Sequence, residues 1–145
     1  MRTLPQTKKR IVAVALSSAL AVMAGYSSMA FGENVTLSGS SEVPPVTTTA
    51  TGTGTITIDA DRSVKGSVTV KDLTATASHI HEGAAGTNGP VIVPFTKTGD
   101  NTFAPAADAK LTEAQYAAYK AGNLYVNVHS AKNAGGEVRA QLKGS

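Results

Sequence analysis

The sequence predicts an all-β domain of antiparallel strands, arranged as a sandwich or a barrel, with one short helix. Apolar and polar residues alternate with a period of two in several short segments, and turn-forming residues separate these segments. A single segment carries the residues that typically start a helix. The chain has 145 residues, of which 41% are hydrophobic and 16% charged, so its length and composition are those of one globular domain.

Residues 1–30 have the features of a secretory signal peptide. Four basic residues and no acidic one lie in the first ten positions, and an apolar run follows over residues 11–25. Ser28 and Ala30 are the small residues of a cleavage site after Ala30, with Ala24 as the second choice. A membrane-spanning helix needs about 20 apolar residues, and this run is shorter and contains serines. We therefore expect an exported protein, periplasmic or extracellular, with no stable membrane span after signal cleavage.

The expected mature chain, residues 31–145, contains no cysteine, methionine or tryptophan. Disulfides therefore cannot stabilise it, and it lacks the thiolate that a blue-copper centre requires. Four of the thirteen basic residues belong to the signal peptide, which leaves nine basic against ten acidic residues. The positive charge of the whole chain is thus local, and this composition excludes a nucleic-acid partner.

Six segments of the mature chain are expected to be strands. In residues 64–71, for example, Val64, Val68 and Val70 alternate with polar residues, which is typical of a strand with one face buried. Residues 31–34 are expected to be a loose terminus. The expected strands are 51–58, 64–71, 75–81, 90–96, 124–129 and 137–142. The expected core consists of Ile56, Ile58, Val68, Val70, Val126, Val128, Val138 and Leu142.

One helix is expected near residues 112–121. Thr112 and Gln115 have the spacing of a capping box, in which each side chain bonds the backbone of the other residue. Gly122 is well placed just past the helix end. We expect the helix to cross over one end of the sandwich, with Tyr116 and Tyr119 as its packing stripe.

The three histidines of the chain suggest a metal site. His79 and His81 lie two residues apart in one expected strand, so both side chains point to the same face. His129 ends another expected strand and could supply a third imidazole, and three imidazoles suit copper(II) or zinc. Glu82 and Glu137 are candidate carboxylate ligands, although surface charge or loop hydrogen bonds explain them more simply. The alternative to a metal site is that the three histidines are ordinary surface residues held by hydrogen bonds.

Other catalytic motifs are weak, and we assign no catalytic residue. Residues 83–89 are rich in glycine but lack the Lys-Ser/Thr ending of a phosphate-binding loop and precede no helix. This segment is expected to be a flexible connection between strands. No GxSxG sequence supports a serine hydrolase.

A pattern of six segments spans nearly the whole mature chain in order. They are LSGSSEVPP at 37–45, TGTG at 51–54, HIHEG at 79–83, NGP at 88–90, GNLYVNVHS at 122–130 and GGEVRAQL at 135–142. Together they resemble a CHRD domain, the module named after chordin and common in exported bacterial proteins. The resemblance implies an immunoglobulin-like, Greek-key β-sandwich related to copper/zinc superoxide dismutase. The family has no firmly assigned biochemical activity.

The local similarity to the dismutase implies copper-ligand roles for His79, His81 and His129. A His-x-His pair followed by glutamate, and a later strand-ending histidine, are similar to its copper ligands. Its bridging and zinc histidines have no counterpart, because this chain has no fourth histidine, and its disulfide is absent. Where the dismutase has an anion-guiding arginine, this chain has Glu137, with Arg139 two residues further on.

The preferred hypothesis is an exported module that binds one copper ion through three histidines, for copper sequestration or delivery, with zinc as the alternative metal. The second hypothesis is a redox enzyme of the superoxide dismutase kind. The third is a structural module that binds another protein without a metal. Stoichiometric metal binding separates the first two from the third, and turnover separates the first from the second.

We predict that residues 1–30 are missing from the exported protein, because their basic start, apolar run and small-residue exit form a signal peptide. N-terminal sequencing of material recovered outside the cytoplasm should begin at Phe31, or at Gly25 for cleavage after Ala24. Exported protein that still begins at Met1 would contradict this expectation.

Overall fold

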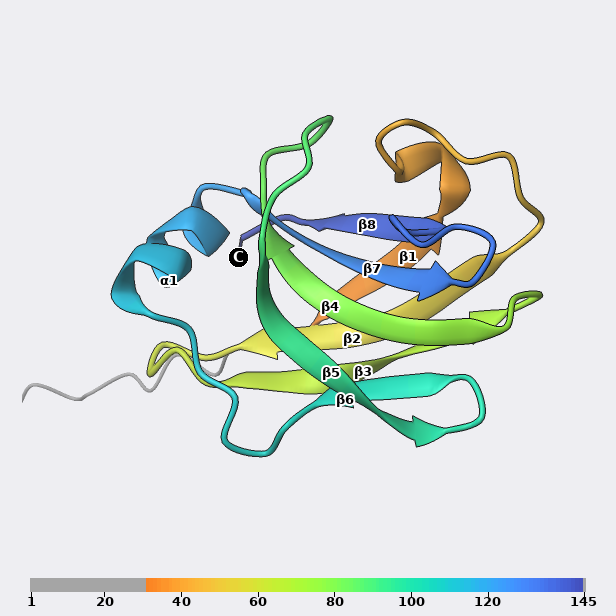
Figure 1. Ribbon diagram of the computed structural model, residues 1–145. Helices are drawn as coiled ribbons and strands as arrows, with labels where there is room; N and C mark the ends of the chain where they lie inside the picture. The colour runs from red at the N-terminus through yellow and green to blue at the C-terminus, as the bar shows by residue number, and fades with distance from the viewer. Residues whose placement is uncertain (1–30, 145) are drawn as a thin grey trace, which may run out of the picture.

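The computed structural model describes residues 31–144, so the expected signal peptide lies outside the described residues. In this part of the chain eight antiparallel strands close into a barrel, with one helix at its end (Figure 1). The strands are β1 (Glu33–Ser38), β2 (Thr51–Ile58), β3 (Val64–Lys71), β4 (Ala75–Glu82), β5 (Val91–Gly99), β6 (Thr102–Pro105), β7 (Leu124–Ser130) and β8 (Val138–Leu142). The helix α1 is Glu113–Lys120, and a 3-10 turn, η1, spans Gly39–Ser41.

The barrel closes through two narrow contacts. The strands neighbour one another in the order β1-β2-β3-β6-β5-β4-β7-β8. β3 meets β6 at two residue pairs, and β1 meets β8 at Ser38 and Arg139. Consecutive strands β4, β5 and β6 lie side by side while β3 lies beside β6, which is a Greek-key order. The expected sandwich is therefore corrected to a closed barrel. Alternation alone could not separate the two, because both architectures bury one face of every strand.

The interior of the barrel is the core that the alternation predicts. All eight residues expected in the core are buried, and the most accessible of them, Ile58, is only 5% exposed. Ile80 on β4, Leu124 on β7 and Phe103 on β6 complete the same interior. Each strand thus contributes its apolar face to one continuous cluster, and its polar face remains outside.

Two strands lie outside the expected set. Residues 33 and 34 were expected in a loose terminus, but β1 begins at Glu33 and pairs along its length with β2. Its apolar pair, Val35 and Leu37, is buried, and two apolar residues are too few to establish a period. β6 has only four residues and ends in Pro105, yet it places Phe103 in the core.

The helix forms as its capping residues predict. The Thr112 hydroxyl accepts a hydrogen bond from the Gln115 amide at 3.2 Å, and the Gln115 side chain accepts one from the Thr112 amide at 2.8 Å. Gly122 follows with φ of +76°, the left-handed conformation that ends helices. Tyr119 is buried in the core, while Tyr116 packs at its margin. Within the described residues no helix has the length and apolar character to cross a membrane.

We predict that Val126→Ala destabilises the protein by about 1–3 kcal/mol, because Val126 is fully buried and its loss leaves a cavity. Val91→Ala is the matched control, since Val91 lies on β5 with 48% of its surface exposed, and its effect should stay within about 0.5 kcal/mol. Chemical denaturation measures both. Equal effects of the two substitutions would show that burial does not set the cost.

Candidate metal centre

Strands β4 and β7 bring the three histidines together on the outer face of the barrel. His79 and His81 flank the buried Ile80 on β4, so their side chains point outward. On the neighbouring β7, His129 lies opposite Ala77, which places it diagonally beside His79 on the same face. One ring nitrogen from each of the three histidines lies within 4.8 Å of the others. The predicted convergence of the histidines is therefore confirmed.

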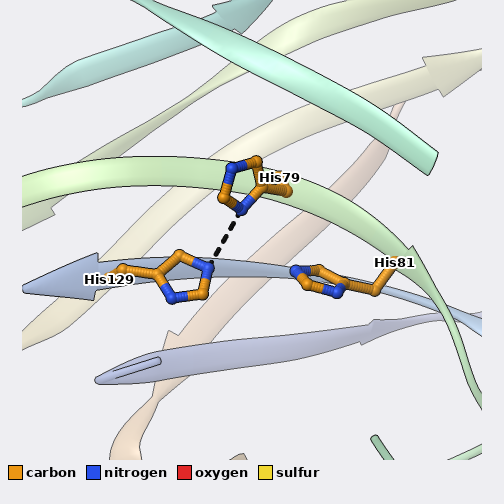
Figure 2. Close-up of side chains that lie close together, drawn as sticks. All are labelled: His79, His81 and His129. Atoms are coloured by element: carbon orange, nitrogen blue, oxygen red, sulfur yellow. Dashed lines mark hydrogen bonds between the residues drawn. The ribbon is translucent and has the colours of Figure 1, made fainter. Parts of the chain in front are cut away.

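The spacing of the rings suits a single metal ion. His79 Nδ1 and His129 Nε2 are 3.0 Å apart, the contact drawn as a dashed line in Figure 2. Two nitrogens that each lie about 2.0–2.1 Å from one ion are separated by roughly 3 Å. His81 directs a ring nitrogen toward the same region (Figure 2). The centroid of the His81 ring lies 5.5 Å from that of the His79 ring and 6.0 Å from that of the His129 ring.

Backbone carbonyls fix which nitrogen of two rings carries the proton. His81 Nδ1 lies 2.9 Å from the carbonyl oxygen of Gly89, and His129 Nδ1 lies 2.9 Å from that of Ala134. A carbonyl can only accept, so each Nδ1 is the donor and each Nε2 keeps its lone pair. Within the described chain the buried Nε2 of His81 has no hydrogen-bond partner. Carbonyl-oriented imidazoles of this kind are typical of metal ligands.

Tyr125 and Gly89 hold the His81 ring in place. The Tyr125 ring stacks on the His81 ring with centroids 4.8 Å apart and planes 5° apart. The Gly89 amide donates to the Tyr125 hydroxyl at 3.1 Å, while the Gly89 carbonyl accepts from His81. A Cβ at Gly89 would lie 1.6 Å from the carbonyl oxygen of Glu82, so this position requires glycine. Residues 83–89, expected to be a flexible connection, instead form hydrogen bonds that support the site.

Arg139 packs on the other side of Tyr125, because β7 lies between β4 and β8. Its guanidinium carbon is 3.4 Å from the centroid of the Tyr125 ring. Its Nη atoms donate to the side chain of Asn88 and the carbonyl of Ala84, each at 3.3 Å. Arg139 thereby ties β8 to the loop that carries Gly89.

Neither candidate carboxylate belongs to the histidine cluster. Glu82 is exposed, and the group that could hold a metal contains only histidines. Glu137 is buried and accepts hydrogen bonds from the hydroxyls of Thr48, at 2.7 Å, and Ser130. These bonds, that from Ser130 first, hold the pKa of Glu137 below its usual value. Glu137 therefore fastens the segment before β2 to the end of β7, a structural role.

Burial keeps two of the histidines neutral. Desolvation lowers the pKa of His79 and of His81 below the usual 6.5, and the neighbouring imidazoles lower both further. For His81 the hydrogen bond to Gly89 opposes this effect. Neutral imidazole is the form that binds metal ions, so the site is prepared for a cation at neutral pH.

Glu42 is a buried acid within electrostatic reach of Arg139, and sequence reasoning missed it. It is 4% exposed, and within the described chain its Oε1 has no hydrogen-bond partner. Burial raises its pKa to about 7, against the opposing effects of the Arg139 charge and of the nearby Asn127 side chain. Glutamate next to Val43-Pro44 gives no local sign of burial, because the burial comes from β7 and β8.

Comparison with known protein families gives a match over most of the described chain. A family model described as the CHRD domain matches residues 34–142, a range that contains the three histidines and nearly all of the barrel. No curated protein and no solved structure matches the chain.

We predict that Glu42→Gln stabilises the protein increasingly as the pH rises from 5 to 8. The folded pKa of Glu42, about 7, exceeds its usual 4.5, so the folded state binds more protons in this interval and loses stability as the pH rises through about 7. Glutamine removes this titration. Denaturation midpoints at pH 5 and pH 8 measure the difference, and the histidines contribute equally to both proteins. A difference independent of pH would contradict the assignment.

Proposed function

This chain belongs to the CHRD domain family, and we propose that its domain binds one metal ion, copper in the first place, through His79, His81 and His129. The observation that carries the proposal is the direction of the ring nitrogens. Two rings are turned by backbone carbonyls so that their Nε2 lone pairs face the cluster, and His79 Nδ1 lies 3.0 Å from one of them.

The alternative in which the histidines only fasten loops explains this arrangement less well. Loop fastening needs one hydrogen bond from each ring, and Gly89 and Ala134 already accept those of His81 and His129. It gives no reason for His81 to bury its second nitrogen without a partner in the described chain. A buried acceptor of this kind is costly unless a donor or a cation completes it.

The donor set favours copper and leaves zinc as the alternative. Imidazole suits both ions, and the general affinity order puts copper(II) above zinc. To bind an ion, His79 would give up the hydrogen bond to His129, because both nitrogens of that bond become ligands. Bound copper would supply one-electron redox chemistry. The three histidines would hold the ion, and Tyr125 and Gly89 would keep the His81 ring in position.

We further propose that the protein works outside the cytoplasm, in copper sequestration or delivery. The signal-peptide features of residues 1–30 support export. A metal-free module that binds another protein, and a dismutase-like enzyme, are the competing functions. A metal titration separates the copper-binding module from the metal-free module. An assay of superoxide turnover separates the copper-binding module from the enzyme.

We predict that His81→Ala removes most copper binding, because it deletes one of three ligands together with the stacked ring. Glu82→Ala is the matched control, since Glu82 is exposed and outside the cluster, and it should bind copper nearly as the wild type does. Binding should weaken in acid, because protons compete with the metal ion for imidazole, and the lowered pKa of His79 and His81 moves their competition to a more acidic pH than that of ordinary histidines.

Competition titration with copper(II), combined with elemental analysis, measures affinity and stoichiometry. One copper ion per wild-type chain, and none in the variant with all three histidines replaced by alanine, would support the proposal. Equal copper content in both proteins would refute it.

A further inference from the structure

Arg139 is a buried cation without an ion-pair partner in the described part of the chain. Its exposed fraction is 1%, and within residues 31–144 the ion pair present joins Lys65 and Asp59 instead. The guanidinium donates to three neutral oxygens, those of Asn88, Ala84 and Gln141, each at 3.3 Å. Its charge is therefore solvated by dipoles and by an aromatic ring, and no carboxylate in contact neutralises it.

Arg139, Tyr125 and His81 form a continuous column. The guanidinium carbon lies 3.4 Å from the Tyr125 centroid, and the His81 centroid lies 4.8 Å from it on the opposite face. All three side chains are at least nine-tenths buried. Mobile ions cannot enter the column, so the field of the guanidinium reaches the His81 ring with little screening.

We propose that Arg139 is a selectivity-determining residue of the metal site, which disfavours divalent ions relative to monovalent ones. The inference rests on the proposed function, because it concerns an ion held by His81. Repulsion between the fixed charge and the ion grows with the charge of the ion. For copper, this repulsion favours copper(I) over copper(II).

The expected size of this preference follows from Coulomb's law. One unit of charge at a separation on the order of 10 Å, with an effective dielectric constant of about 20, changes an equilibrium constant by about ten-fold. Glu42 is the carboxyl group whose charge acts on Arg139, and its pKa of about 7 leaves it partly neutral near pH 7. It therefore offsets the guanidinium only in part.

The test compares two ions that do not change oxidation state. Silver(I) and zinc(II) are titrated separately into the purified protein at pH 8 in chloride-free buffer, and the ratio of the two dissociation constants is the readout. Arg139→Gln removes the charge, and the ratio should move about ten-fold in favour of zinc. Arg139→Lys keeps the charge and should preserve the ratio of the dissociation constants, even where the altered packing weakens the binding of both ions equally.

Glu42→Gln provides a second variant, whose effect on the ratio of the two dissociation constants should have the opposite sign. At pH 8 the wild-type Glu42 is mostly ionised, so its removal should shift the ratio toward silver. This variant keeps the inference testable where Arg139→Gln fails to fold. With copper bound, Arg139→Gln should also lower the reduction potential of the metal.

The outcomes separate this inference from the proposed function. Tight binding of both ions with the same ratio in Arg139→Gln as in the wild type would overturn the selectivity role and leave the metal site intact. If Arg139→Gln does not fold, Glu42→Gln is the test. An unchanged ratio of the two dissociation constants in Glu42→Gln would then overturn the selectivity role and leave the metal site intact. Failure of the wild-type protein to bind either ion would overturn the metal site itself.

Discussion

The register of β4 against β7 is the constraint on which both the core and the site depend. Ile80, Val126 and Val128 point inward and are completely buried, while His79, His81 and His129 point outward from the same two strands. Because side chains alternate along a strand, a slip of one residue would turn the histidines into the barrel interior and the aliphatic residues out of it. The energy that holds the core together therefore also fixes which imidazoles face one another.

The outer face of these strands is polar yet mostly enclosed. The segment before β2 covers it through the bond from Thr48 to Glu137, and the loop after β4 covers it through the contacts of Asn88 with Val43 and Arg139. This cover explains why His81, Tyr125 and Arg139 are buried although they lie outside the barrel. It also explains why Glu42, His79 and His81 have shifted pKa values, since a freely solvated face would leave them near their usual ones.

Sequence patterns predicted what depends on neighbouring residues and missed what depends on distant ones. Alternation located the core residues, the capping box at Thr112 located the helix, and the two-residue spacing of His79 and His81 located the cluster. Alternation could not favour the closed barrel over the sandwich, because closure depends on the pairing of Ser38 with Arg139, which lie about a hundred residues apart. The support of His81 by Tyr125 and Gly89 was missed for the same reason, since the chain brings them together only through the register of β4, β7 and the intervening loop.

The orientation of His81 and His129 by main-chain carbonyls has a consequence for how such a site changes over evolutionary time. The acceptors belong to Gly89 and Ala134, and every residue type carries the same carbonyl group. A point substitution in these loops cannot delete the acceptor unless it alters the path of the chain, as a side chain at Gly89 would. Insertions and deletions move the carbonyl itself. Loop length, more than loop composition, is therefore the heritable property that preserves the imidazole geometry.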